Sequence, residues 1–131
     1  MRVDHVGLAV RSLAVTVPKF ERLLGTRGST PEEVVSQRVR VSFLDAEGTH
    51  VELLEPTDPT SPVARFLDSR GEGMHHLAFA VPNVTAALGE LEARGEKVID
   101  RQSRPGARGR RVGFAHPKAF DGVLVEFVEG P

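Results

Sequence analysis

Apolar and polar residues alternate along two short segments of the chain, and the two segments match each other. Residues 3–10 and residues 74–81 both show the alternation of a half-buried β-strand. Each is followed by an N-cap residue, Ser12 or Asn83, and then by a helical stripe of apolar residues that ends at a glycine. Pro18 lies inside the first stripe, which suggests that the first helix begins there.

Strand patterns follow each of these predicted helices. In the first half, residues 33–45 indicate two strands with a break near Ser36, and residues 49–55 indicate a third. In the second half, three further strands are expected at residues 96–100, 110–115 and 122–129. The pattern therefore predicts an α+β fold in which a βαβββ unit occurs twice.

The two units are expected to form a single domain over residues 1–131. The copies occupy about 1–56 and about 73–131, and a linker helix is predicted at about 61–70, where a Ser-Pro pair opens an apolar stripe. We expect that neither copy can bury its sheet alone, and so we interpret the chain as one domain with an internal duplication.

Two histidines and two glutamates recur at equivalent points of the duplicated unit. His5 shares a strand face with Gly7 and Ala9, and His76 shares a face with Ala78 and Ala80. Each histidine therefore heads a row of small side chains that leaves room for a cavity. His75 points with the bulky side chains of its strand, so His76 is the better candidate for a ligand.

Glu52 and Glu126 each lie inside an apolar strand, where an unpaired carboxylate is costly. Two imidazoles and two carboxylates suit a first-row divalent metal, with room left for water or substrate. A histidine in a strand is more often structural, and a buried glutamate often pairs with an arginine. The repetition of both residue types supports a metal site, while a structural role remains the alternative at this point.

Bulk properties exclude several other functions. The 131 residues carry a formal net charge of −1, with a sequence pI of about 6.5, so nothing in the charge demands nucleic acid or a membrane surface. The chain has no cysteine and hence no disulfide or thiolate chemistry. No apolar run is long enough for a membrane span, and the first residues lack the apolar stretch of a signal peptide. We therefore expect a cytoplasmic protein.

Several motifs are similar to those of one family. They are Asp4-His5-Val6-Gly7-Leu8-Ala9-Val10, Glu52-Leu53-Leu54-Glu55-Pro56, Ser61-Pro62-Val63-Ala64-Arg65-Phe66-Leu67, Gly71-Glu72-Gly73-Met74-His75-His76, Gly113-Phe114-Ala115-His116-Pro117-Lys118 and Gly122-Val123-Leu124-Val125-Glu126. The chain resembles the vicinal oxygen chelate superfamily (glyoxalase I, extradiol dioxygenases and bleomycin-resistance proteins) over nearly its whole length. The paired histidines, the Ser-Pro helix and the His-Pro-Lys turn are more specific, and resemble the methylmalonyl-CoA epimerase family.

This resemblance implies a fold, a metal and an assembly. The two modules are expected to lie side by side in a curved, cup-like mixed sheet with helices on its outer face. The implied metal ligands are His5, Glu52, His76 and Glu126. Co²⁺ is the favoured ion, and Zn²⁺, Mn²⁺, Ni²⁺ and Mg²⁺ are compatible. A homodimer is expected.

The resemblance also implies a reaction, the interconversion of (2R)- and (2S)-methylmalonyl-CoA in propionate metabolism. The metal would stabilise an enolate formed when the C2 proton leaves, and Glu126 and Glu52 are the candidate acid and base. Some epimerases carry a further glutamate in the strand that here spans residues 36–41, where this chain has no carboxylate. Gln37 is a candidate polar contact there instead.

Lys118 and His116, in the His-Pro-Lys turn, are further candidate substrate contacts. Five arginines surround the Gly-rich loop before this turn, and they either bind CoA phosphates or belong to a solvated loop: Arg101, Arg104, Arg108, Arg110 and Arg111. Two other functions remain as alternatives. One is a glyoxalase I-like lyase that acts on a thiol adduct, and the other is a non-catalytic protein that binds small molecules.

Overall fold

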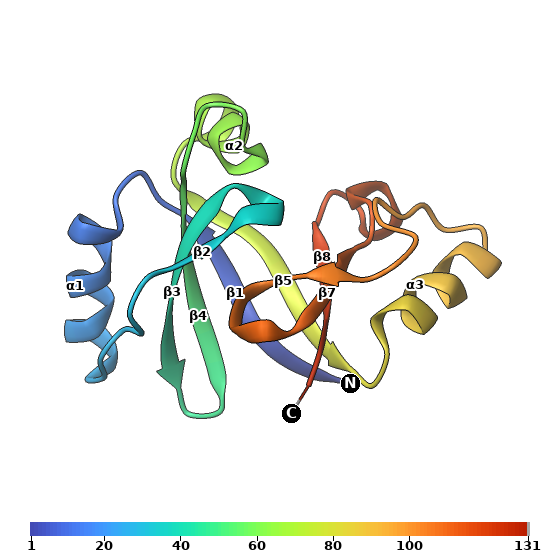
Figure 1. Cartoon of the computed structure of the whole chain (residues 1–131), viewed down its shortest axis with the longest axis horizontal. Coiled ribbons are helices and arrows are strands. Elements are labelled where there is room, and N and C mark those ends of the chain that lie inside the picture. The colour runs from blue at the N-terminus through green and yellow to red at the C-terminus, as the bar shows by residue number, and fades with distance from the viewer. Residues whose placement is uncertain (131) are drawn as a thin grey trace. The chain divides into compact units, whose positions relative to one another are not determined.

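The computed structural model describes residues 1–130 and contains, within them, eight β-strands and three α-helices (Figure 1). In chain order these are β1 (Arg2–Ala9), α1 (Leu13–Leu24), β2 (Glu32–Val34), β3 (Val39–Ala46), β4 (Thr49–Pro56), α2 (Pro62–Arg70), β5 (Gly73–Val81), α3 (Val84–Ala93), β6 (Arg104–Pro105), β7 (Arg111–Phe114) and β8 (Val125–Glu129). Short 3-10 helices are η1 (Val35–Gln37), η2 (Ala107–Gly109) and η3 (Pro117–Phe120). The predicted α+β class and the twice-repeated βαβββ order are confirmed, and α2 forms at the position where the Ser-Pro pair predicts a helix.

The chain forms two compact units. One comprises His5–His75, and the other comprises Met1–Asp4 together with the residues from His76 onward. The first strand thus begins in one unit and continues in the other. The interpretation of residues 1–131 as a single duplicated domain stays a prediction.

The sheet of the His5–His75 unit has the strand order β2-β3-β4-β1. The strands β3 and β4 form a long antiparallel hairpin, and β1 runs parallel to β4. The hairpin turns at Glu47 and Gly48, whose φ angles are 55° and 98°. Positive φ at both turn residues matches the twist of the flanking strands, so a two-residue turn suffices.

Helix α1 begins at Leu13, and Pro18 lies within it, so the expectation that the helix begins at the proline is wrong. Two side chains stabilise the start of the helix at Leu13. The Ser12 hydroxyl accepts a hydrogen bond from the Val15 N–H at 3.3 Å, and the Glu55 carboxylate accepts one from the Leu13 N–H at 2.8 Å. These caps outweigh the one backbone hydrogen bond that the proline removes.

The apolar face of α1 packs against its own sheet. Figure 1 shows the helix alongside β3 and β4, and the cluster between them comprises Val10, Leu13, Leu44 and Leu53, flanked by Leu8, Val17, Phe20, Leu24 and Val51. The bulky row of β1 therefore builds core, as the strand pattern predicts, and the small row that contains His5 lies on the opposite face.

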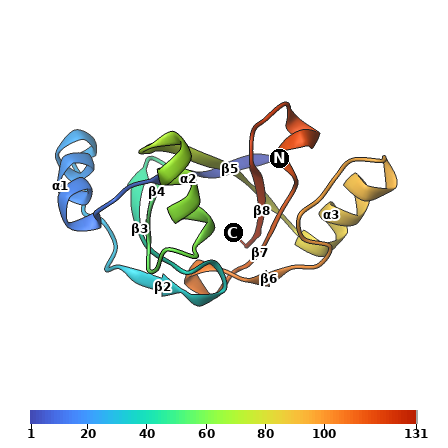
Figure 2. The ribbon, with the colours of Figure 1, turned by 90° about the horizontal axis from the view of Figure 1, so that it is seen from above.

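The second unit repeats this plan, with the strand order β5-β8-β7-β6 and with β5 parallel to β8. Helix α3 lies alongside β7 and β8 in both views (Figures 1 and 2). Its first turn is capped by Asn83, which accepts from the Ala86 N–H at 2.8 Å, and by Glu129, which accepts from the Val84 N–H at 2.9 Å. Glu129 and Glu55 thus have the same capping role in the two repeats.

Two strand predictions in this unit are wrong. Residues 96–100 form only an isolated bridge, between Val98 and Ala115. The last strand begins at Val125, because the preceding N–H groups bond to the η3 turn: that of Gly122 to the Pro117 carbonyl and that of Val123 to the Phe120 carbonyl. No helix within residues 1–130 is long and apolar enough to cross a bilayer.

Candidate metal and acid–base site

His5 and Glu52 form a buried pair in the His5–His75 unit. The parallel register places Glu52 opposite Gly7, and residues that pair across strands share a face, so Glu52 lies on the face of His5. The imidazole Nε2 is 3.2 Å from the carboxylate Oε1. Only 4% of His5 and 6% of Glu52 are exposed. The small residue Gly7 leaves space in which the longer carboxylate can reach the imidazole.

His76 and Glu126 form the equivalent pair in the other unit. Glu126 is opposite Ala78 in the parallel register of β5 and β8, and so it lies on the face of His76. The distance between Nε2 of the histidine and Oε1 of the glutamate is 3.1 Å, and both residues are 4% exposed. The duplication seen in the sequence therefore extends to the geometry of the side chains.

Each histidine also contacts a phenylalanine that lies two strands away in the sheet. Phe43 meets the ring of His5 edge to face, with the centroids 5.8 Å apart and the planes at 90°. Phe114 meets His76 at 5.9 Å and 88°. The register sets Phe43 opposite Glu52 and Phe114 opposite Glu126. These packing contacts hold the imidazole rings in place. The sequence analysis assigned the two phenylalanines no role, although their alignment in the repeat could have identified them.

The structure separates the two consecutive histidines as strand alternation predicts. His76 is buried beside Glu126, whereas the ring of His75 meets Phe66 of α2 at 4.9 Å. His75 therefore packs against a helix, and His76 is the member of the pair that lies beside the Glu126 carboxylate.

The donors of each pair fit a divalent ion. Two ligand atoms that lie about 2.1 Å from one ion are about 3.0–3.4 Å apart at octahedral or tetrahedral angles. The two Nε2–Oε1 distances, 3.2 Å and 3.1 Å, match this spacing. Buried carboxylates also require a compensating positive charge. Each pair therefore offers an imidazole nitrogen and a carboxylate oxygen that could bind a metal ion.

The predicted substrate contacts lie outside these pairs. His116 caps η3, and its Nδ1 accepts a hydrogen bond from the Lys118 N–H at 3.0 Å. Partial burial, together with the positive charges of Lys97 and Lys118, lowers the pKa of His116 below 6.5, which favours the neutral ring. The Lys118 side chain is exposed. Gln37 lies in η1, where its backbone carbonyl accepts a hydrogen bond from the Ser61 hydroxyl at 3.2 Å.

Four of the five clustered arginines have polar partners within their own unit. Arg101 pairs with Glu92 at 3.3 Å, and Arg104 pairs with Asp100 at 3.4 Å and lies over Phe114. Arg111 donates to Ser103, and Arg110 to Asp4 and to the Glu129 carbonyl. These contacts favour structural roles for Arg110 and Arg111.

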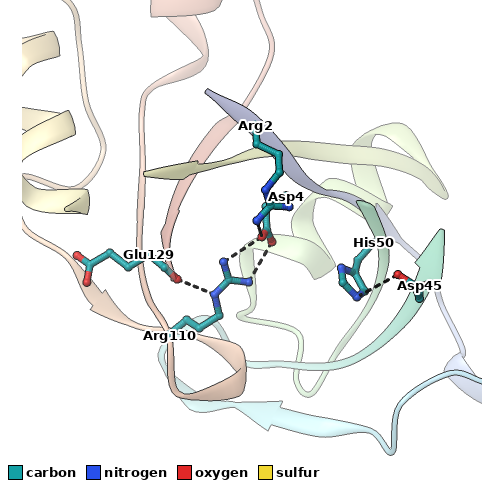
Figure 3. Close-up of polar contacts among 6 residues, drawn as sticks. All are labelled: Arg2, Asp4, Asp45, His50, Arg110 and Glu129. Atoms are coloured by element: carbon teal, nitrogen blue, oxygen red, sulfur yellow. Dashed lines mark hydrogen bonds and ion pairs between the residues drawn. The ribbon is translucent and has the colours of Figure 1, made fainter. Parts of the chain in front are cut away.

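A further polar pair on the His5 face was not predicted from the sequence. His50 lies two residues before Glu52 on β4, and its Nε2 is 3.7 Å from Asp45 (Figure 3). The ring of Phe43 meets His50 edge to face at 6.3 Å, as it also meets His5, and the register sets His50 opposite His5. The second repeat has Leu124 at the equivalent point, so no repeated signal marks His50.

Comparison with known proteins defines the class first. A sequence profile of the Glyoxalase/Bleomycin resistance protein/Dioxygenase superfamily matches residues 4–114. The duplicated fold and the paired histidines and glutamates described above agree with this match.

More specific relatives cover almost the entire chain. It is 35% identical to the ethylmalonyl-CoA/methylmalonyl-CoA epimerase of Cereibacter sphaeroides, over 95% of each sequence. The crystal structure of methylmalonyl-CoA epimerase from Mycobacterium tuberculosis is 34% identical, with a TM-score of 0.92 over 98% of this chain and 87% of that one. A methylmalonyl-CoA epimerase in complex with methylmalonyl-CoA and NH4+ is 35% identical, with a TM-score of 0.92 over 98% and 94%. The chain belongs to this superfamily and, within it, to the methylmalonyl-CoA epimerase family of enzymes.

Proposed function

We propose that this chain is a metal-dependent epimerase that interconverts (2R)- and (2S)-methylmalonyl-CoA by removing and returning the proton at C2. The observation that carries the proposal is the repeated buried pair, His5 with Glu52 and His76 with Glu126. Such a duplicated set of two imidazoles and two carboxylates suits a reaction that needs both a cation and two proton-transfer groups.

The proposed metal ligands are His5, Glu52, His76 and Glu126, which together bind one divalent ion. Co²⁺ is the proposed ion, by resemblance to the family. When bound, the ion would supply positive charge beside the thioester oxygen, where negative charge develops as the C2 proton leaves. The edge-to-face contacts of Phe43 and Phe114 support this role, because they restrict both imidazole rings to one orientation.

Glu52 and Glu126 are proposed as the acid and base. One carboxylate takes the proton from C2, and the electron pair of the broken C–H bond delocalises into the thioester carbonyl. The other group, protonated, gives a proton to the opposite face of C2. The two glutamates come from different repeats of the chain, and this supports a division of labour between the two faces. The segment 36–41 contains no carboxylate, so these two glutamates are the proposed pair.

The proposed substrate is an acyl-CoA, with Lys118, His116 and Gln37 as contacts. Lys118 has an exposed ammonium that suits a phosphate, and the lowered pKa of His116 keeps its ring neutral, able to donate or accept a hydrogen bond. By the same family resemblance we propose that the protein acts in the cytoplasm as a homodimer. The acyl-CoA complex of a relative supports the substrate class.

The direct test starts from one pure epimer of methylmalonyl-CoA. Protein loaded with Co²⁺ should convert it to the mixture of epimers, whereas chelator-treated protein should not. The hemithioacetal of glutathione and methylglyoxal is the parallel substrate that tests a glyoxalase I-like lyase. Turnover of this adduct with no epimerisation would overturn the proposal, and so would binding of methylmalonyl-CoA without turnover of either substrate.

Matched variants on the same strands separate catalysis from stability. Glu126→Gln and Glu52→Gln should lower kcat at least tenfold, because each removes a proton acceptor. Glu129→Gln and Glu55→Gln lie three residues further along the same two strands, and alter the helix caps and the ion pair of Glu55 with the exposed Arg40. These controls should keep kcat. Equal losses in both sets would show that the glutamates act through stability.

A further inference from the structure

Arg110 makes three polar contacts within its unit. It lies just before β7, and its guanidinium forms a two-pronged contact with Asp4, from Nη1 to Oδ2 at 3.1 Å and from Nη2 to Oδ1 at 2.9 Å. Its Nε donates to the Glu129 carbonyl at 2.6 Å (Figure 3). One planar group therefore joins the beginning of β1 to the end of β8. A bidentate contact of this kind fixes direction as well as distance.

The contact is also partly buried. Asp4 is 3% exposed, and the Arg110 side chain is 17% exposed. Arg2 approaches the same carboxylate at 3.3 Å, but its side chain is 48% exposed. Ion pairs of the second kind contribute little and are screened by solvent. Arg110 is therefore the partner that holds Asp4 in place.

Each of the two strands that Arg110 joins carries one proposed ligand. Asp4 directly precedes His5 on β1, and Glu129 follows Glu126 by three residues on β8. Neighbouring side chains of a strand point to opposite faces, so fixing Asp4 on one face fixes the direction of His5 on the other.

We propose that Arg110 is a positioning residue for the metal site, which orients His5 through Asp4 and Glu126 through the end of β8. The inference rests on the proposed function, because it assumes that these two residues bind the ion. It accounts for an arginine at position 110, where the guanidinium is partly buried against a carboxylate. A lysine at that position keeps the charge but cannot make the two-pronged contact and the Glu129 contact together.

The test is the affinity of the chelator-treated full chain for Co²⁺, with Arg110→Lys compared to the original protein by titration calorimetry. Changes to groups that orient metal ligands typically weaken binding by about 10–100-fold, and we expect a loss in this range. The visible absorption of the Co²⁺-loaded variant should also shift, since that spectrum reports ligand geometry. Arg111→Lys is the matched control: this neighbouring residue contacts Ser103 and should leave both readouts unchanged.

The outcomes separate this inference from the proposed function. If the original protein binds no Co²⁺, the metal site itself is refuted. If it binds Co²⁺ and Arg110→Lys has the same affinity and spectrum but a lower melting temperature, Arg110 is only a structural tie and the inference is wrong. Asp4→Asn, which keeps the shape of the side chain, repeats the test from the other partner. Should Arg110→Lys fail to fold, unchanged Co²⁺ binding by Asp4→Asn would overturn the inference, and weakened binding would support it.

Discussion

Replacing one or the other of two consecutive histidines tests the site at its most specific point. His76→Asn removes the imidazole whose Nε2 is 3.1 Å from Glu126, and His75→Asn removes one that meets Phe66 edge to face at 4.9 Å. The two changes are chemically identical and lie on the same strand. A difference in their effects must therefore come from the face on which each side chain lies.

The expected energies follow from these contacts. Without metal, His76→Asn costs about 1–3 kcal/mol of unfolding free energy, because the buried Glu126 loses a polar partner. His75→Asn costs about 0.5–1.5 kcal/mol, for one aromatic pair. Bound metal should increase the difference in stability between the two variants. Co²⁺ at 100 times its Kd stabilises a protein by about 2.7 kcal/mol, and a 100-fold weaker Kd would leave about 0.4 kcal/mol of this.

The assay is urea unfolding of each variant with Co²⁺ and with chelator, alongside calorimetric titration. We expect His76→Asn to lose nearly all of the metal-dependent stabilisation and His75→Asn to keep it. If His75→Asn abolished Co²⁺ stabilisation while His76→Asn retained it, the assignment of strand faces and the proposed ligand set would both be wrong.

Three further predictions concern the surroundings of the site. Glu55→Ala and Glu129→Ala should each lower the unfolding free energy by about 0.5–2 kcal/mol through loss of a charged helix cap, with Co²⁺ affinity intact; a loss of affinity would contradict their structural role. Phe114→Leu should cost about 0.5–1.5 kcal/mol for the ring pair and weaken Co²⁺ binding, while an unchanged Kd would show that the ring does not orient His76. NMR titration should give His116 a pKa below its unfolded value of 6.5, and Lys97→Gln should raise that pKa. Because the folded pKa is lower than the unfolded one, the stability that the neutral ring contributes is complete above pH 6.5. This stability falls as the pH drops below 6.5.

The internal repeat made most of the fold predictable. Because the strand and helix patterns occur twice, each weak local signal was supported by its counterpart, and the caps Ser12 and Asn83 marked both helices correctly. The errors fall where long-range or turn contacts decide the structure. Capping by Glu55, which is distant in sequence, lets α1 begin on the N-terminal side of Pro18. The η3 turn binds the N–H groups that a longer β8 would need.

The candidate site was predictable only in part. Strand alternation placed His5 and His76 on the small-residue faces, and the parallel register then brings each glutamate beside its histidine. Arg110 could not be assigned in this way, because its partner Asp4 is 106 positions away and the contact depends on where two strand ends meet. Local patterns carry no information about such a pair.

The most direct test of the central claim is hydrogen exchange at C2. Methylmalonyl-CoA is incubated in D₂O with the Co²⁺-loaded protein, and deuterium at C2 is followed by NMR or mass spectrometry against the non-enzymatic rate. We predict rapid incorporation that stops when the metal is chelated and returns when Co²⁺ is restored. Exchange no faster than in buffer, by protein shown to contain its metal, would contradict the account.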